Sequence, residues 1–210
     1  MNAGPHLIRI LAVDDHYIFR QGVVGLLADQ KDMELVAEAC NGREAVQLFR
    51  AHQPDITLMD LQMPEMSGLE AVIAIRGEFP EAKIIVLTTY SGDVQVLRAL
   101  KAGARGYLLK NLLHQELLET IRAVHVGKKT LSSEASFELA EHAMDESLTP
   151  AEVDVLRLIA AGNANKQIAV HLSITEETVK GRVKNILSKL NANDRTHAAT
   201  IGLKRGIIEL

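Results

Sequence analysis

The chain has 210 residues, of which 47% are hydrophobic, 24% charged and 3% aromatic, and its formal net charge is −4. No hydrophobic run approaches the roughly 18 residues that a membrane-spanning helix needs, so the sequence argues against a transmembrane protein. His6 and Arg9 interrupt the N-terminal hydrophobic stretch, which does not have the layout of a signal peptide. The one cysteine, Cys40, excludes an internal disulfide framework and agrees with a cytoplasmic location.

Charge is unevenly distributed along the chain. Residues 1–126 carry 12 Lys and Arg against 16 Asp and Glu, residues 127–147 carry 2 against 5, and residues 148–210 carry 9 against 6. The length predicts two domains. The basic C-terminal part indicates contact with a polyanion, although a solvated basic helix face would give the same excess.

Short hydrophobic runs alternate with segments of helical spacing in residues 1–126. The runs have strand length and are mostly bounded by Asp, Gly, Pro or Asn; they are Leu7–Val13, Leu35–Ala39, Asp55–Met59, Lys83–Leu87 and Arg105–Leu109. Five strand-then-helix units predict parallel strands joined by right-handed crossovers. The expected fold is therefore α/β, a five-stranded doubly wound parallel sheet with helices on both faces.

The rest of the chain predicts a linker and then a smaller helical domain. Residues 127–147 are polar and weakly periodic, with one short helix expected over Ser133–His142. Residues 148–210 keep helical spacing throughout and predict an all-α domain of four helices. Its first helix begins clearly, because Thr149 can cap it and Glu152 follows three residues later.

Acidic residues follow the first and third predicted strands. Since the carboxyl ends of parallel strands meet at one edge of a sheet, Asp14, Asp15 and Asp60 should converge there. Such a cluster repels itself unless a hard cation binds, and oxygen ligands with room for water suit Mg²⁺. Thr88 and Lys110, after the fourth and fifth strands, add a hydroxyl and an ammonium. The set predicts a carboxylate that accepts a phosphoryl group; helix caps and surface ion pairs are the alternative explanation.

A basic face lies on the helix that opens near Thr175. A short helix over Lys166–Leu172 precedes it at helix-turn-helix spacing. The residues expected to face outward and to contact DNA are Lys180, Arg182, Lys184, Asn185, Ser188 and Lys189. Lys180 and Lys184, one turn apart, are placed to reach base edges or phosphates. A solvated face is the alternative explanation.

Motifs in a fixed order run through residues 1–126. They are Asp14-Asp15, Met59-Asp60-Leu61-Gln62-Met63-Pro64, Ser67-Gly68, Leu87-Thr88-Thr89 and Gly106-Tyr107-Leu108-Leu109-Lys110. This set resembles the receiver domain of bacterial two-component response regulators, which has a flavodoxin-like sheet. The resemblance implies that Asp60 is the phosphoacceptor and that Asp14, Asp15, Asp60 and the backbone carbonyl of Gln62 hold Mg²⁺. It also implies that Thr88 and Lys110 bind the phosphoryl oxygens and that Tyr107 is the switch aromatic.

A second set of motifs occupies the helical domain. It consists of Leu148–Val153, Leu156–Ala160, Asn165–Ala169, Thr178–Lys180 and Asn185–Leu190. These residues resemble the LuxR-type helix-turn-helix domain, and the whole chain is similar to response regulators of the NarL/FixJ type. The resemblance implies DNA contacts by Lys180 and Lys184, and pairing of two domains through the last helix, about Asp194–Arg205.

Together these features predict a phosphorylation-controlled transcriptional regulator and not an enzyme. The implied partners are a sensor histidine kinase, double-stranded promoter DNA, a second copy of the chain on activation, and RNA polymerase; no membrane contact is expected. A regulator that works without phosphorylation, an enzyme of aspartyl-phosphate chemistry and a purely structural interaction module are the alternatives. A dehalogenase-type phosphatase would need a second acid where Gln62 stands, and no phosphate-binding glycine loop occurs.

Overall fold

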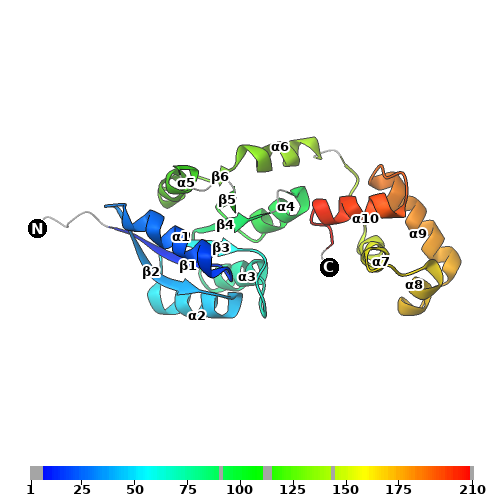
Figure 1. Cartoon of the computed structure of the whole chain (residues 1–210), viewed down its shortest axis with the longest axis horizontal. Helices are drawn as coiled ribbons and strands as arrows, with labels where there is room; N and C mark the ends of the chain where they lie inside the picture. The colour runs from blue at the N-terminus through cyan, green and yellow to red at the C-terminus, as the bar shows by residue number, and fades with distance from the viewer. Residues whose placement is uncertain (1–6, 90–91, 111–114, 143–144, 209–210) are drawn as a thin grey trace, which may run out of the picture. The chain divides into compact units, whose positions relative to one another are not determined.

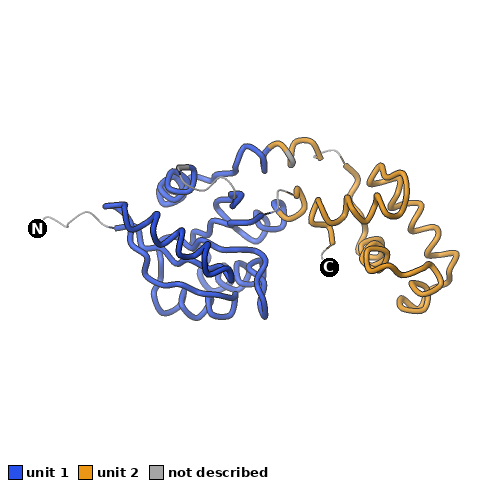
Figure 2. The backbone as a smooth tube through the Cα atoms, in the orientation of Figure 1, with its two compact units in different colours: residues 1–89, 96–136 blue, residues 90–95, 137–210 orange. Residues whose placement is uncertain are grey.

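The structure, a computed structural model, describes residues 7–89, 92–110, 115–142 and 145–208. The chain divides into two compact units, drawn in different colours in Figure 2. Unit 1 comprises residues 1–89 and 96–136, and unit 2 comprises residues 90–95 and 137–210.

Unit 1 is built on a parallel sheet with the strand order β2-β1-β3-β4-β5-β6 (Figure 1). Its strands are β1 (Ile8–Val13), β2 (Met33–Ala39), β3 (Ile56–Asp60), β4 (Ile84–Thr88), β5 (Gly106–Leu109) and β6 (Thr130–Leu131). The predicted doubly wound sheet is confirmed, with one strand more than expected. The extra strand, β6, lies inside the predicted linker and pairs with β5. Two residues are too few to show a hydrophobic period, so the sequence carries no signal for it.

The central strands are hydrophobic along their whole length because helices cover both faces of the sheet. Every residue of β3 and β4 is buried, whereas the edge strand β2 is only partly so. Continuous hydrophobic runs are typical of parallel strands that are buried on both sides. Because the strands are parallel, their carboxyl ends lie at the same edge of the sheet, where β3 ends on Asp60 and β4 on Thr88.

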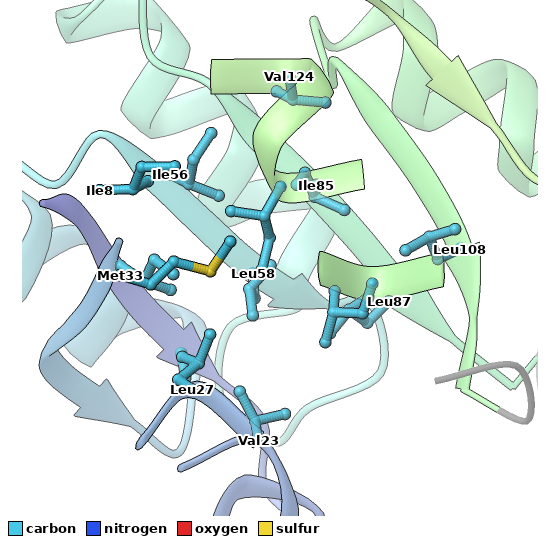
Figure 3. Packing of buried hydrophobic residues seen from close by; sticks show 14 residues of the cluster. Ile8, Val23, Leu27, Met33, Ile56, Leu58, Ile85, Leu87, Leu108 and Val124 are labelled. Atoms are coloured by element: carbon cyan, nitrogen blue, oxygen red, sulfur yellow. The ribbon is translucent and has the colours of Figure 1, made fainter. Parts of the chain in front are cut away.

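Two hydrophobic clusters hold the helices of unit 1 against the sheet. These helices are α1 (Tyr17–Ala28), α2 (Gly42–His52), α3 (Gly68–Glu78) and α5 (Gln115–His125). A further helix, α4 (Asp93–Lys101), begins in unit 2 and continues in unit 1. In the first cluster, shown in Figure 3, Val23 and Leu27 of α1 and Val124 of α5 pack with Leu58 and Leu87. In the second cluster, residues of α2 and α3 pack on the other face. The helices therefore lie on both sides of the sheet, as a doubly wound topology requires.

Unit 2 contains the predicted four-helix region. Its helices are α7 (Pro150–Ala160), α8 (Asn165–His171), α9 (Glu176–Lys189) and α10 (Arg195–Lys204), and α6 (Ser133–Glu141) crosses the division between the units. Thr149 and Glu152 form the expected capping box at the start of α7. Buried residues of α7, α8 and α9, among them Val155, Ile168 and Ile186, share one hydrophobic cluster.

Among the described residues, no helix combines the length and the hydrophobicity needed to cross a membrane.

Candidate functional site

Three carboxylates converge at the carboxyl edge of the sheet, as the sequence predicts. Asp14 directly follows β1 and Asp60 is the last residue of β3, and these two are only 2% and 3% exposed. One ligand atom from each of Asp14, Asp15, His16 and Asp60 lies within 4.8 Å of the others. Parallel neighbours β1 and β3 end side by side, which brings residues 46 positions apart into one pocket.

Lys110, which follows β5, reaches across to the two buried carboxylates. Its Nζ lies 2.7 Å from Asp14 Oδ2 and 2.8 Å from Asp60 Oδ2. The ammonium also lies 4.7 Å from the centre of the Phe19 ring, at a distance that allows a cation–π interaction. The side chain is 10% exposed, so these three contacts fix its charged end.

Burial and charge act in opposite directions on the carboxyl group of Asp60. Burial raises the pKa of Asp60 above its ordinary value, although the hydrogen bond and the charge of Lys110 work to lower it; the charge of Asp14 adds to the increase. Burial works to lower the pKa of Lys110, but its bonds to Asp14 and Asp60 outweigh burial and raise it. The lysine is therefore charged, and one positive charge does not fully compensate the cluster of acidic groups.

Thr88 and Tyr107 lie next to this pocket on neighbouring strands. Thr88 ends β4 and is 1% exposed, and Tyr107 on β5 is completely buried. Burial raises the pKa of the Tyr107 hydroxyl, while its hydrogen bond with Thr88 works in the opposite direction. Thr88 and Tyr107 are therefore hydrogen-bonded to each other on the neighbouring strands β4 and β5.

Residues that follow β3 contact Asp60 through their backbone atoms. The backbone amide of Gln62 donates to Asp60 Oδ1 at 3.4 Å. Gly68, the first residue of α3, has its Cα against the backbone of Asp60: an added Cβ would lie 1.7 Å from the carbonyl oxygen of Asp60. Only glycine fits at this approach, and the Ser67-Gly68 motif in the sequence is the signal of it.

Two neighbours of the pocket were missed at the level of sequence. His16 has Nδ1 2.8 Å from Asp15 Oδ1, and Phe19 covers the ammonium of Lys110. Both stand within five residues of the acidic pair at the start of α1, and that position is the signal that could have identified them.

The donor set fits a divalent cation. Three carboxylates offer oxygen ligands at one edge of the sheet. Among the described residues, Lys110 is the lysine whose ammonium lies within hydrogen-bond distance of Asp14 and Asp60. Oxygen ligands with open positions for water are what Mg²⁺ prefers. Asp14, Asp15 and Asp60 are the side chains that would hold it.

The basic face of α9 is only partly as expected. Lys180, Lys184, Asn185 and Ser188 are exposed, while Arg182 is half-buried. Lys180 lies 3.8 Å from Glu176 and 3.6 Å from Glu177, both also exposed, so these are weak surface pairs. Four of the six predicted side chains are therefore accessible to solvent on α9.

Lys189 does not face outward as the sequence pattern predicts. Its side chain is 14% exposed, and its Nζ binds Glu152 Oε2 at 3.0 Å and the carbonyl oxygen of Ser147 at 3.3 Å. The bond to Glu152 raises the pKa of Lys189. Lys189 therefore ties the end of α9 to the start of α7. Helical periodicity alone could not show this, because the partner lies 37 residues away.

Two family models match the sequence, one on each part of the chain. The response regulator receiver domain matches residues 10–122, and the luxR family of bacterial regulatory proteins matches residues 146–201. The chain is a response regulator. Its family consists of DNA-binding transcriptional regulators and not enzymes, which confirms the class predicted from the sequence.

Relatives match this response regulator over nearly its whole length. The uncharacterized transcriptional regulatory protein YhcZ of Bacillus subtilis is 42% identical over 206 residues, covering 94% of this chain and 96% of YhcZ. The transcriptional regulatory protein LiaR of Bacillus subtilis is 40% identical over 210 residues, covering 96% of this chain and all of LiaR. The crystal structure of the response regulator ChrA, from a heme-sensing two-component system, has a TM-score of 0.58 at 31% identity and covers 96% of this chain and 99% of ChrA.

Proposed function

We propose that this response regulator accepts a phosphoryl group on Asp60 from a sensor histidine kinase, with Mg²⁺ at Asp14, Asp15 and Asp60. The observation that carries the proposal is the geometry of Lys110, whose ammonium lies within 2.8 Å of Asp60 Oδ2 beside two further carboxylates. A carboxylate in this position can act as a nucleophile, because the ammonium and a divalent ion can neutralise the negative charge of the phosphorylated product.

The transfer needs few groups from the protein. An oxygen of Asp60 forms a bond to phosphorus while the bond between phosphorus and the kinase histidine nitrogen breaks. A bound divalent ion supplies charge neutralisation on the phosphoryl oxygens. Lys110 would bind one of these oxygens and the Thr88 hydroxyl another. The backbone carbonyl of Gln62 would complete the metal shell, and Tyr107 would follow Thr88.

The phosphorylated state would act through the DNA-binding unit. We assign the DNA contacts to the exposed residues Lys180, Lys184, Asn185 and Ser188, with Arg182 nearer to the phosphates. Two observations support this assignment: the four side chains are exposed on one helix, α9, and that helix belongs to the region that matches the luxR family. We infer that two copies pair on activation, with α10 as the pairing helix, and that the dimer binds promoter DNA and meets RNA polymerase. From these partners we infer a cytoplasmic location.

Labelling by a small phosphodonor tests the acceptor. Incubation with radiolabelled acetyl phosphate and Mg²⁺ should label the unmodified protein, and acid, base or hydroxylamine should remove the label, as expected of an acyl phosphate. Asp60→Asn should not be labelled. The control variant is Asp29→Asn, which removes an exposed carboxylate after α1 and should label like the unmodified protein. Equal labelling of Asp60→Asn would reject the assignment.

A further inference from the structure

A groove with a volume of about 610 Å³ lies between α3 and the C-terminal part of α4. Both of its sides belong to unit 1, because α4 is part of that unit from Val96 onward. None of the described residues that line the groove is acidic, and none belongs to the carboxylate pocket. Sites for small molecules have volumes of about 300–1,000 Å³, so the groove has the size of a ligand site.

One face of α3 forms a hydrophobic side of the groove. Leu69, Ile73 and Gly77 line the groove and stand four residues apart, so they share one face of the helix. Ile73 is 55% exposed, which leaves its side chain available to a hydrophobic ligand. An added Cβ on Gly77 would meet no atom within 4 Å, so the groove is open beside this glycine.

Three basic side chains also line the groove. Arg98 and Lys101, both exposed, stand three residues apart on α4, and Arg76 of α3 joins them. Arg76 Nη1 donates to the backbone carbonyl of Ala82 at 3.0 Å. An added Cβ on Gly103, which follows α4, would lie 2.6 Å from Arg76 Nε. The guanidinium of Arg76 therefore reaches from α3 to the end of α4.

The lining defines the class of ligand by complementarity. A hydrophobic side favours a hydrocarbon body, and three positive charges with no acidic lining residue favour one negative group. We propose that this groove binds a small organic anion that is free in solution, a carboxylate with a hydrophobic body. The body packs on Leu69 and Ile73, and the carboxylate pairs with Arg98 and Lys101. The inference does not depend on phosphorylation of Asp60.

Two probes with the same body test the negative charge. Octanoate and the neutral octanamide are titrated separately into the full chain, and binding is followed by the amide signals in NMR spectra. Because one exposed ion pair contributes up to about fivefold in affinity, octanoate beside three cations should bind at least about fivefold tighter than octanamide. The signals of Ile73, Gly77 and Lys101 should shift. Equal affinities, no binding of octanoate, or shifts confined to other elements would overturn the proposal.

Gly77→Leu tests the place of binding, because the new side chain fills the open space beside α3 and leaves the cations unchanged. The control is Gly25→Leu, since Gly25 is also an exposed helical glycine with no atom within 4 Å of an added Cβ. Leucine is the better helix former, so both variants should fold. The octanoate affinity should fall at least about tenfold in Gly77→Leu, where probe and side chain compete for space, and stay unchanged in Gly25→Leu. Equal affinities of the two variants would overturn the proposal.

Lys101→Gln tests the charge from the side of the protein. It should weaken octanoate binding about two- to fivefold and leave octanamide binding unchanged. The control Lys128→Gln removes an exposed lysine that follows α5 and should change neither affinity. A Lys101→Gln variant that is less stable but binds octanoate as before would show that this lysine serves only the dipole at the end of α4, which would overturn the assignment.

Discussion

A single close contact at the carboxyl edge of the sheet determines whether the loop after β3 can take its observed conformation. Gly68 lies so close to Asp60 that a single methyl group would collide with the backbone carbonyl of Asp60. Gly77 stands in the same helix, α3, with nothing within 4 Å of an added Cβ. The two glycines therefore form a matched pair for which opposite outcomes are expected.

Gly68→Ala should destabilise the protein by about 2–3 kcal/mol, because the backbone on one side of the contact must move. Gly77→Ala should raise the stability by up to about 1 kcal/mol, since alanine is the better helix former. Thermal or urea unfolding followed by circular dichroism measures both. A Gly68→Ala variant as stable as Gly77→Ala would show that the loop after β3 moves freely.

Asp60 should lower the stability of the metal-free protein at neutral pH. Because burial raises its pKa in the folded state, the folded protein keeps a proton where the unfolded chain has lost it, from about pH 3.9 upward. Stability from this group is therefore present at low pH and is lost as the pH rises through the folded pKa. Asp60→Asn should unfold several degrees higher than the unmodified protein at pH 7, with a difference that shrinks toward pH 4.

The control for this pH series is again Asp29→Asn, whose carboxyl is exposed. A difference between Asp60→Asn and the unmodified protein that is the same at pH 4 and pH 7 would contradict the prediction. Saturating Mg²⁺ should reduce the difference at pH 7, because the ion stabilises only a folded state that can bind it.

At the scale of elements, two lysines of α9 that look equivalent in the sequence differ in their exposure to solvent. Lys184 is exposed, whereas Lys189 is held by Glu152 at the start of α7. A lysine that neutralises a DNA phosphate releases a counterion, and a lysine engaged inside the unit does not.

Lys184→Ala should lower the affinity for promoter DNA and reduce the slope of log affinity against log salt by about 1. Lys189→Ala should leave that slope unchanged while lowering the thermal stability, since it removes the ammonium that pairs with Glu152. Fluorescence anisotropy titrations at several salt concentrations measure the slopes, with Lys128→Ala as a charge-matched control outside α9. An equal loss of slope in Lys189→Ala would restore that residue to the DNA contacts.

The elements differ in how far the sequence determines them. β3 and β4 are continuous hydrophobic runs, and Thr149 with Glu152 is a local capping signal, so both follow from neighbouring residues. β6 and the Lys189 pair depend on partners far along the chain, which no local pattern encodes. In the pocket, Asp14, Asp60 and Lys110 follow from the rule for strand ends. The contacts of His16 and Phe19 depend on how α1 begins, which that rule does not describe.

At the scale of the whole molecule, the proposed function requires that phosphorylation in unit 1 changes the activity of unit 2. Such control requires that phosphorylated Asp60 favours one of two states, and the shift can be no larger than that preference.

Phosphorylation should convert monomer to dimer and increase DNA affinity together. Sedimentation analysis after treatment with acetyl phosphate and Mg²⁺ should show a doubled mass for the unmodified protein and for Asp29→Asn, but not for Asp60→Asn. If the two DNA-binding domains of one dimer bind together, the apparent affinity for DNA with two half-sites should rise about 100-fold or more. A dimer of equal strength without phosphodonor would favour a receiver that serves association alone.

The complete burial of Tyr107 limits how such a message can travel. A ring enclosed by a close-packed interior cannot rest between two rotamers, because any rotation forces the surrounding atoms to move with it. If this side chain carries the signal, the receiver must switch between two discrete conformations and cannot change gradually. Intermediate doses of phosphodonor would then yield mixtures of fully resting and fully activated molecules.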